Sequence, residues 1–212
     1  MNIERYEVGP LNTFCYLIYC SETKEAMLVD PADTTGALKK KIEQLDVKIK
    51  YIVNTHGHPD HTSGNKLFID AFHAPLVMHP IDDEFFRTKE ARQMIYSWGF
   101  DISPPADIHI KDGDTINIGK LSFTCIHTPG HSPGSICLYG HGHVITGDTL
   151  FVGAAGRTDL PGGSFEQLIS SICKKLSTLP DETIVLPGHN YGETPTSTIA
   201  KEKKNNIFMK DC

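Results

Sequence analysis

Short apolar runs alternate along the chain with segments in which apolar residues recur at helical spacing. In the first half, the apolar runs predict strands over 14–20, 26–29, 51–53 and 76–78. Helical spacing predicts three helices, over 36–45, around 67–72 and over 82–97. The helix over 36–45, for example, places Leu38, Ile42 and Leu45 on one face.

The second half repeats this order of strands and helices. Strands are predicted over 121–126, 136–139, 144–145 and 184–186, and helices over 164–176 and 196–205. A capping box of Ser164 and Gln167 opens the first of these helices. Residues 108–110 and 115–118 flank an Asp-Gly-Asp turn and predict a β-hairpin. No stretch resembles a linker, so we expect one layered α/β domain over residues 1–212.

Composition and charge exclude several classes of function. The 212 residues carry a formal net charge of −6, which gives no electrostatic reason to bind nucleic acid or an anionic membrane. The longest apolar run, 14–20, is far shorter than the roughly 20 residues that span a bilayer. Glu4, Arg5 and Glu7 interrupt the N-terminus before a signal peptide could form. We therefore expect a cytoplasmic protein.

The cysteines suggest no chemistry of their own. None of the six forms a CxxC pair, and a domain of this size does not need bridges, so reduced thiols are expected. Cys15 and Cys20 are five positions apart in one predicted strand and should point to opposite faces of the sheet.

The candidate chemistry begins directly after the predicted strand 51–53. His56, His58, Asp60 and His61 place three imidazoles and a carboxylate within six residues. Residues two apart in an extended segment share a face, so His56 and His58 can bind one ion together. Asp60 and His61 follow Pro59 at an expected helix start, where the chain turns, and can hold a second ion nearby. Imidazole nitrogen and carboxylate oxygen are ligands for zinc and similar divalent metals.

Three further candidate ligands lie at the ends of other predicted strands. His131, Asp148 and His189 each lie beside a glycine, shortly after a predicted strand. Each of these residues taken alone is common in turns. Together with the first cluster they make five histidines and two aspartates, and this coincidence favours a metal site.

Other residues carry weaker signals. Asp30 ends a predicted strand and is either an outer partner that orients a ligand imidazole or an ordinary turn aspartate. The glycine-rich loop after Asp148 is either a surface connection or a substrate contact, in which case Gly156, Arg157 and Thr158 would touch substrate and Arg157 would bind a carboxylate. The second His-x-His pair, at 141 and 143, is expected in a solvated turn.

The seven candidate ligands resemble the metallo-β-lactamase superfamily in type, order and spacing. The resemblance covers nearly the whole chain and implies a four-layer αβ/βα sandwich with metals at one sheet edge. It implies that His56, His58 and His131 bind one metal, that Asp60, His61 and His189 bind another, and that Asp148 bridges them.

Within the superfamily the chain is most similar to the glyoxalase II-like branch, through residues 146–151 and 156–159. That likeness implies a hydrolase of a small acyl thioester with two divalent ions, most readily zinc, with iron or manganese as alternatives. The ions would activate water for attack on the carbonyl, and Asp60 would orient the water and transfer its proton. The acyl group and thiol carrier stay open, since hydroxyacylglutathione hydrolases usually carry further C-terminal helices with basic glutathione contacts.

Two alternatives remain. Persulfide dioxygenases share the His-x-His-x-Asp-His pattern and a Gly-Arg-Thr-Asp segment, and the resemblance implies that one iron would be held by His56, His131 and Asp148. These three form the two-histidine, one-carboxylate triad of non-haem iron oxygenases. A non-catalytic metal-binding protein is less favoured, because a structural site is closed and four-coordinate whereas seven ligands indicate an open one.

Overall fold

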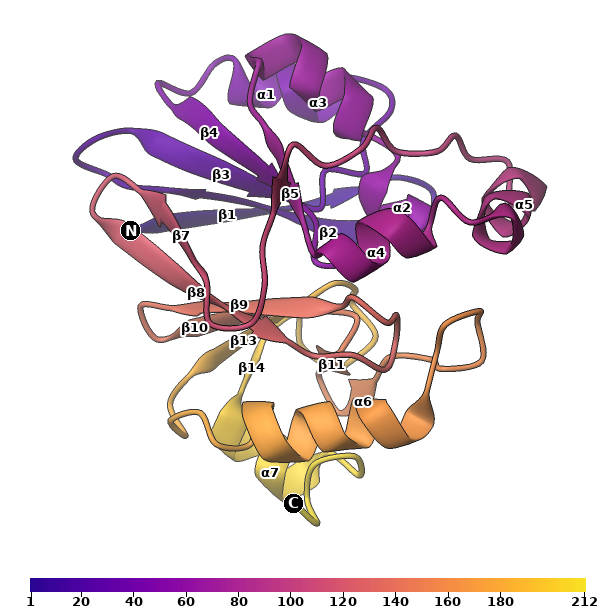
Figure 1. Cartoon of the computed structure of the whole chain (residues 1–212). Coiled ribbons are helices and arrows are strands. Elements are labelled where there is room, and N and C mark those ends of the chain that lie inside the picture. Colours follow the sequence, from indigo (N-terminus) through magenta and orange to yellow (C-terminus); the bar gives the residue numbers. More distant parts are fainter.

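Two six-stranded sheets pack face to face in the computed structural model, which describes residues 1–212 (Figure 1). In the first sheet the strands lie in chain order: β1 (Asn2–Val8), β2 (Thr13–Tyr19), β3 (Glu25–Val29), β4 (Lys48–Val53), β5 (Leu76–Met78) and β6 (Ile108–His109). The second sheet has the order β14 (Ser197–Thr198), β13 (Ile184–Pro187), β10 (His143–Gly147), β9 (Ile136–Gly140), β8 (Leu121–His127) and β7 (Thr115–Ile118). A small hairpin of β11 (Leu150–Phe151) and β12 (Ala154–Ala155) follows β10.

Helices cover the outer faces of both sheets. The first sheet is covered by α1 (Ala37–Ile42) and α3 (Asn65–Phe72), and the second by α6 (Phe165–Ser171), its π-helical continuation (Ile172–Leu176) and α7 (Ile199–Asn205) (Figure 1). Three short helices, α2 (Pro59–Thr62), α4 (Pro80–Phe85) and α5 (Lys89–Ser97), lie beside the sheets. The order helix, sheet, sheet, helix is the predicted four-layer αβ/βα sandwich. None of the helices is long and apolar enough to cross a membrane.

The apolar core divides into three layers that match this order. On β2, Phe14, Tyr16 and Ile18 face the second sheet, whereas Cys15 and Leu17 face α1 and α3. A strand buried on both faces has no polar positions, which is why its sequence is a continuous apolar run. A separate cluster fills the space between the second sheet and its helices.

The same alternation decides where two of the cysteines lie. Cys15 belongs to the outer cluster and Cys20 to the cluster between the sheets, so the prediction of opposite faces is confirmed.

Several predicted elements differ from the structure. The segments 108–110 and 115–118 form no hairpin, because β6 pairs with β5 in the first sheet and β7 pairs with β8 in the second. The Asp-Gly-Asp turn therefore lies in the crossover between sheets. The single helix predicted over 82–97 is two helices, and the side chain of Thr88 accepts a hydrogen bond from the amide of Ala91 to start the second. Strand β1 was not predicted, because its burial is only partial.

The ends of two other helices agree more closely with the sequence. Ser164 caps α6 by accepting a hydrogen bond from the amide of Gln167, as predicted. The last helix begins at Ile199 rather than at 196, because Ser197 and Thr198 pair with β13 as a short edge strand.

The expectation of reduced cysteines is correct for four residues and wrong for two. Cys15, Cys20, Cys125 and Cys137 are free and buried. Cys173 and Cys212 form a disulfide, with their Cα atoms 4.9 Å apart. The pair is separated by 39 positions, and the fold brings the chain end against the π-helical turn, a proximity that no local spacing reveals.

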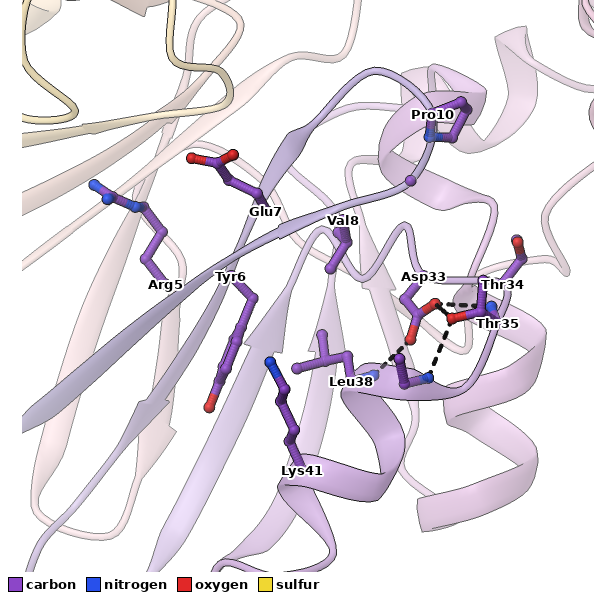
Figure 2. A pocket seen from close by; sticks show the side chains of 12 residues that line it. Arg5, Tyr6, Glu7, Val8, Pro10, Asp33, Thr34, Thr35, Leu38 and Lys41 are labelled. Carbon is purple, nitrogen blue, oxygen red and sulfur yellow. Dashed lines mark hydrogen bonds between the residues drawn. The ribbon is translucent and has the colours of Figure 1, made fainter.

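A groove of about 580 Å³ runs along β1 and the start of α1 (Figure 2). One wall is formed by Asp33, whose carboxylate accepts hydrogen bonds from the amides of Thr35 and Leu38, both at 2.7 Å. The bond from Leu38 satisfies an amide that the first helical turn leaves free, so Asp33 stabilises the start of α1. The carboxylate of Asp33 thus has a structural role.

Candidate metal centre

The seven predicted ligands come together at one edge of the two sheets. His56 and His58 follow β4, Asp60 and His61 lie in α2, and the other three follow strands of the second sheet. Their ligand atoms form three groups, in each of which the atoms lie within 4.8 Å of one another: His56, His58 and His131; His56, His61 and Asp148; Asp60, His61 and His189. Residues 133 positions apart in the chain thus converge on one small volume.

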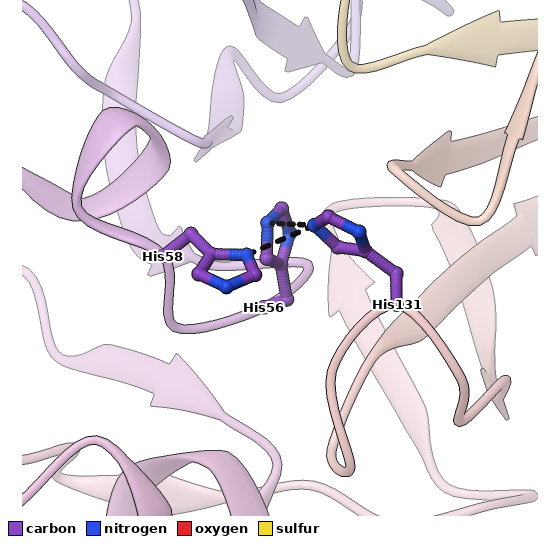
Figure 3. A group of neighbouring side chains, drawn as sticks. All are labelled: His56, His58 and His131. Carbon is purple, nitrogen blue, oxygen red and sulfur yellow. Dashed lines mark hydrogen bonds between the residues drawn. The ribbon is translucent and has the colours of Figure 1, made fainter. Parts of the chain in front are cut away.

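The first group consists of three buried imidazoles (Figure 3). Nε2 of His131 lies 2.9 Å from Nδ1 of His58 and 3.2 Å from Nε2 of His56. Burial holds the pKa of His56 well below its ordinary value and lowers the pKa of His58 to about 3, so these rings are neutral at pH 7.

Hydrogen bonds on the outer side of two rings determine where their protons lie. Nδ1 of His131 donates to the carbonyl of Arg157 at 2.8 Å, which leaves a lone pair on Nε2. Thr55 donates its hydroxyl hydrogen to Asp30 at 2.7 Å and therefore accepts from Nδ1 of His56 at 3.1 Å. Both Nε2 atoms then direct lone pairs into the same space. Lone pairs that face one another repel, and a cation bound between them would relieve this repulsion.

Asp60, His61 and His189, called the second group from here on, join two imidazoles and a carboxylate. Nε2 of His61 lies 3.2 Å from Nε2 of His189 and 3.6 Å from Oδ2 of Asp60. The same Oδ2 atom lies 3.4 Å from Nε2 of His189. Nδ1 of His61 donates to Asp30 at 3.0 Å, so its Nε2 also carries a lone pair in the neutral ring. Asp30, which the sequence left open as a turn residue or an outer partner, therefore contacts a candidate ligand.

Asp148 lies between the two groups. Its Oδ1 is 3.3 Å from Nε2 of His61, and its Oδ2 is 3.5 Å from Nε2 of His189 and 3.6 Å from Nε2 of His131. A carboxylate in this position can contact an ion in either group, which is the geometry of a bridging ligand.

The electrostatics of the cluster call for positive charge. Burial raises the pKa of Asp148, but the neighbouring imidazoles, His61 foremost, outweigh burial and lower it. For His61 burial lowers the pKa, but the surrounding carboxylates, led by Asp148 and Asp60, hold it well above its ordinary value. Buried carboxylates that remain ionised need a nearby cation, which is either a protonated imidazole or a metal ion.

A divalent metal fits the residues present. Oδ1 of Asp148 is buried without any hydrogen-bond donor, as expected of an oxygen reserved for an ion. Imidazole nitrogen together with carboxylate oxygen suits zinc, iron or manganese. The cluster is therefore a metal-binding His/Asp site whose donors do not select one metal.

Two glycines beside the ligands are sterically required. A Cβ on Gly188 would lie 2.3 Å from Oδ1 of Asp148, and one on Gly156 would lie 1.9 Å from the Asp148 carbonyl. The pair of Gly188 and His189 recognised in the sequence thus reflects close backbone approach as well as turn formation.

The predicted substrate loop lies against the centre, but with an unexpected orientation. Gly156 packs on Asp148, and the carbonyl of Arg157 accepts the hydrogen bond from His131. The guanidinium of Arg157 is exposed and makes two hydrogen bonds, at 2.6 and 2.7 Å, with Asp159. Thr158 is adjacent in the same loop. The loop thus contacts the candidate metal ligands through its backbone and not through the Arg157 side chain.

An aromatic pair that was not predicted lies beside the second group. The ring of Tyr191 stacks on His189 with centroids 4.9 Å apart and an interplanar angle of 11°, and Phe151 packs edge-on against both rings. Tyr191 is 64% exposed. The solvent-facing side of the cluster next to Tyr191 is called the open side from here on. The position of Tyr191 two residues after a ligand was the available signal.

The comparisons with known proteins agree with this geometry. The family profile of the metallo-beta-lactamase superfamily matches residues 8–189. The chain is 34% identical to hydroxyacylglutathione hydrolase GloC of Haemophilus influenzae, over 99% of this chain and 98% of that protein. It is 32% identical to the human mitochondrial persulfide dioxygenase ETHE1, over 92% of this chain and 70% of that protein.

A solved structure shows the same architecture. The crystal structure of TTHA1623 in a di-iron-bound form superposes with a TM-score of 0.83 at 32% identity, and covers 97% of this chain and 99% of that one. The fold and the site define a metal-binding α/β sandwich. The chain belongs to the metallo-beta-lactamase superfamily, so the predicted family and fold class are confirmed.

Proposed function

We propose that the protein is a binuclear metal-dependent hydrolase of small acyl thioesters. The observation that carries the proposal is the position of Asp148 between two groups of ligand atoms. In this assignment His56, His58 and His131 hold one ion, Asp60, His61 and His189 hold the other, and Asp148 contacts both. Zinc is the metal we favour for the centre, with iron and manganese as alternatives that the same donors accept.

The bound ions would supply an activated water near neutral pH and polarisation of the substrate carbonyl. The residues of the chain supply orientation and proton transfer. Asp60 is 13% exposed at its side chain, so it is the ligand carboxylate with most access to the open side. Burial raises the pKa of Asp60, but the neighbouring imidazoles of His61, His189 and His58 together outweigh burial and lower it, so the carboxylate is ionised at pH 7.

Asp60 is also held in place by its neighbours. The hydroxyl of Thr13 donates to the Asp60 carbonyl at 2.8 Å, which ties the start of α2 to β2. A fixed carboxylate can orient a water molecule toward a carbonyl and pass its proton to a leaving thiolate. Asp60 is thus the proposed proton-transfer residue.

The substrate would lie at the open side, between the 156–158 loop and Tyr191. Arg157 would bind an acidic group of the acyl or thiol part by exchanging its pairing with Asp159. A thioester is proposed because the relative from Haemophilus influenzae is a hydroxyacylglutathione hydrolase that the chain matches along its whole length.

The experiment combines metal content with turnover. Elemental analysis of the purified protein should give about two ions per chain, and a panel of acyl thioesters, including a hydroxyacylglutathione, should contain a substrate. Asp148→Ala should abolish turnover and lower the metal content, because it removes the carboxylate that in this assignment contacts both ions. Asp181→Ala, at an exposed carboxylate paired with Lys203, is the matched control. Full activity in Asp148→Ala would refute the bridging role.

A persulfide dioxygenase is the second candidate. The specific observation is that His56, His131 and Asp148 alone form a two-histidine, one-carboxylate set, with distances of 3.2 and 3.6 Å to Nε2 of His131. About one iron per chain, oxygen consumption with a persulfide and no thioester turnover would favour this function over the hydrolase.

A further inference from the structure

One buried carboxylate outside the ligand set is bonded to both loops that carry the first group. Asp82, on α4, is fully buried. Its Oδ2 accepts hydrogen bonds from the amide of Gly57 at 2.8 Å and from the hydroxyl of Ser132 at 2.7 Å. Its Oδ1 accepts from the amide of Gly134 at 2.5 Å.

These donors belong to loops from different sheets. Gly57 stands between His56 and His58 in the loop after β4 of the first sheet. Ser132 follows His131 in the loop between β8 and β9 of the second sheet. A single side chain therefore connects the two halves of the three-imidazole group.

Both loops also pack tightly on α4. A Cβ on Gly57 would lie 2.2 Å from the ring of Phe86, and one on Gly134 would lie 2.5 Å from the amide nitrogen of Asp82. Phe86 packs edge-on against His58, with ring centroids 5.0 Å apart. With no space between the loops and the helix, displacement of α4 would displace the loops.

An acidic residue in the first turn of a helix interacts favourably with the helix dipole. The next residue shows a different local role, since Asp83 bonds to Arg87, to His109 and to the amide of Ala106. None of these partners lies in a ligand loop. Asp82 and Asp83 thus offer adjacent buried carboxylates with separate partners.

We propose that Asp82 is the positioning residue of the three-imidazole metal site. By joining the two loops, it keeps Nδ1 of His58 and Nε2 of His131 at their 2.9 Å separation. The inference rests on the proposed metal centre. It does not depend on which reaction the centre performs, because the expected consequence is a lower affinity of the three-imidazole site for a metal ion.

The test measures ion binding rather than turnover. The metal-free protein is titrated with Co²⁺, whose visible absorption reports ligand geometry, in a His189→Ala background that leaves the three-imidazole site as the tighter one. Adding Asp82→Asn should weaken Co²⁺ binding about 10- to 100-fold, the usual effect of losing a partner that orients ligands, and should change the spectrum. Asp83→Asn in the same background is the matched control, and should leave affinity and spectrum unchanged.

Wild-type affinity and spectrum in the Asp82→Asn protein would overturn the proposal, as would an equal loss in Asp83→Asn. If Asp82→Asn does not fold, Ser132→Ala decides, because it removes one of the three donors and keeps the carboxylate; it should weaken binding, and no change would overturn the proposal. A wild-type protein that binds no Co²⁺ would refute the metal centre itself. Two bound ions without thioester turnover would refute only the proposed reaction.

Discussion

Replacement of Asp30 by asparagine should weaken the second metal site more than the first. The carboxylate of Asp30 accepts hydrogen bonds from Nδ1 of His61 at 3.0 Å, from the hydroxyl of Thr55 at 2.7 Å and from the amide of Thr55 at 2.8 Å. Asp30 has a φ of +52°, a left-handed conformation that asparagine also adopts, so the backbone should be retained. The substitution thus changes one acceptor oxygen into a donor with little change in shape.

The magnitude follows from the proton on His61. If the amide oxygen keeps the Thr55 amide, the new NH₂ group faces Nδ1 of His61, where both groups would be donors. His61 must then lose this bond or move its proton to Nε2, the nitrogen that faces Asp60. Loss of such an outer partner typically costs 10- to 100-fold in metal affinity, or about 1.4 to 2.7 kcal/mol. His56 senses Asp30 only through Thr55, so the three-imidazole site should weaken less.

The assay is competition for metal between the protein and a chelator, with both ions titrated in turn. Asp33→Asn is the matched control, because Asp33 is buried nearby but starts α1 and contacts no ligand. Wild-type affinity for both ions in Asp30→Asn would refute the reasoning, and so would a loss confined to the first site.

Three further outcomes are expected. Cys212→Ser should lower the free energy of unfolding by about 4 kcal/mol, the chain-entropy value for a disulfide that joins residues 39 positions apart. Urea unfolding should show this loss relative to the wild-type protein only when no reductant is present. The pKa of His79 is lowered to about 4 by burial and by its neighbour His127, so the fold binds fewer protons than the unfolded chain and should lose stability as the pH falls from 6.5 to 4. His79→Asn retains an acceptor for the amide of Ile81 and should remove that part of the pH dependence in thermal unfolding; an unchanged pH profile would contradict this. Arg157→Ala should raise KM for an acidic thioester at unchanged metal content, since the carbonyl that bonds to the site is kept; an unchanged KM would return the guanidinium to a surface role.

The candidate ligands could be read from sequence because their signals are local. His56, His58, Asp60 and His61 occupy six consecutive positions after a buried strand, and the others stand beside glycines at strand ends. The ends of neighbouring strands meet at a sheet edge, so a correct strand prediction already places such residues near one another.

The wrong predictions of secondary structure arose where local patterns do not reveal long-range pairing or a helix cap. A turn between two apolar runs has the same local pattern whether the runs pair with each other or with different sheets, so the crossover between β6 and β7 looked like a hairpin. The helix over 82–97 looked continuous because periodicity does not register the cap at Thr88, which interrupts it.

Residue types and spacing by themselves determined the candidate donor set of this protein, the alternation of its strands and helices, and the family to which it belongs. Only the tertiary structure decided which nitrogen of each imidazole faces inward, since those choices depend on partners such as Asp30, 31 positions from His61. It also decided the role of Asp82, whose donors lie 25, 50 and 52 positions away, and the pairing of Cys173 with Cys212. The physical reason is that periodicity and turn chemistry act over a few residues, whereas buried hydrogen bonds are completed by whichever groups the packed sheets bring within about 3 Å.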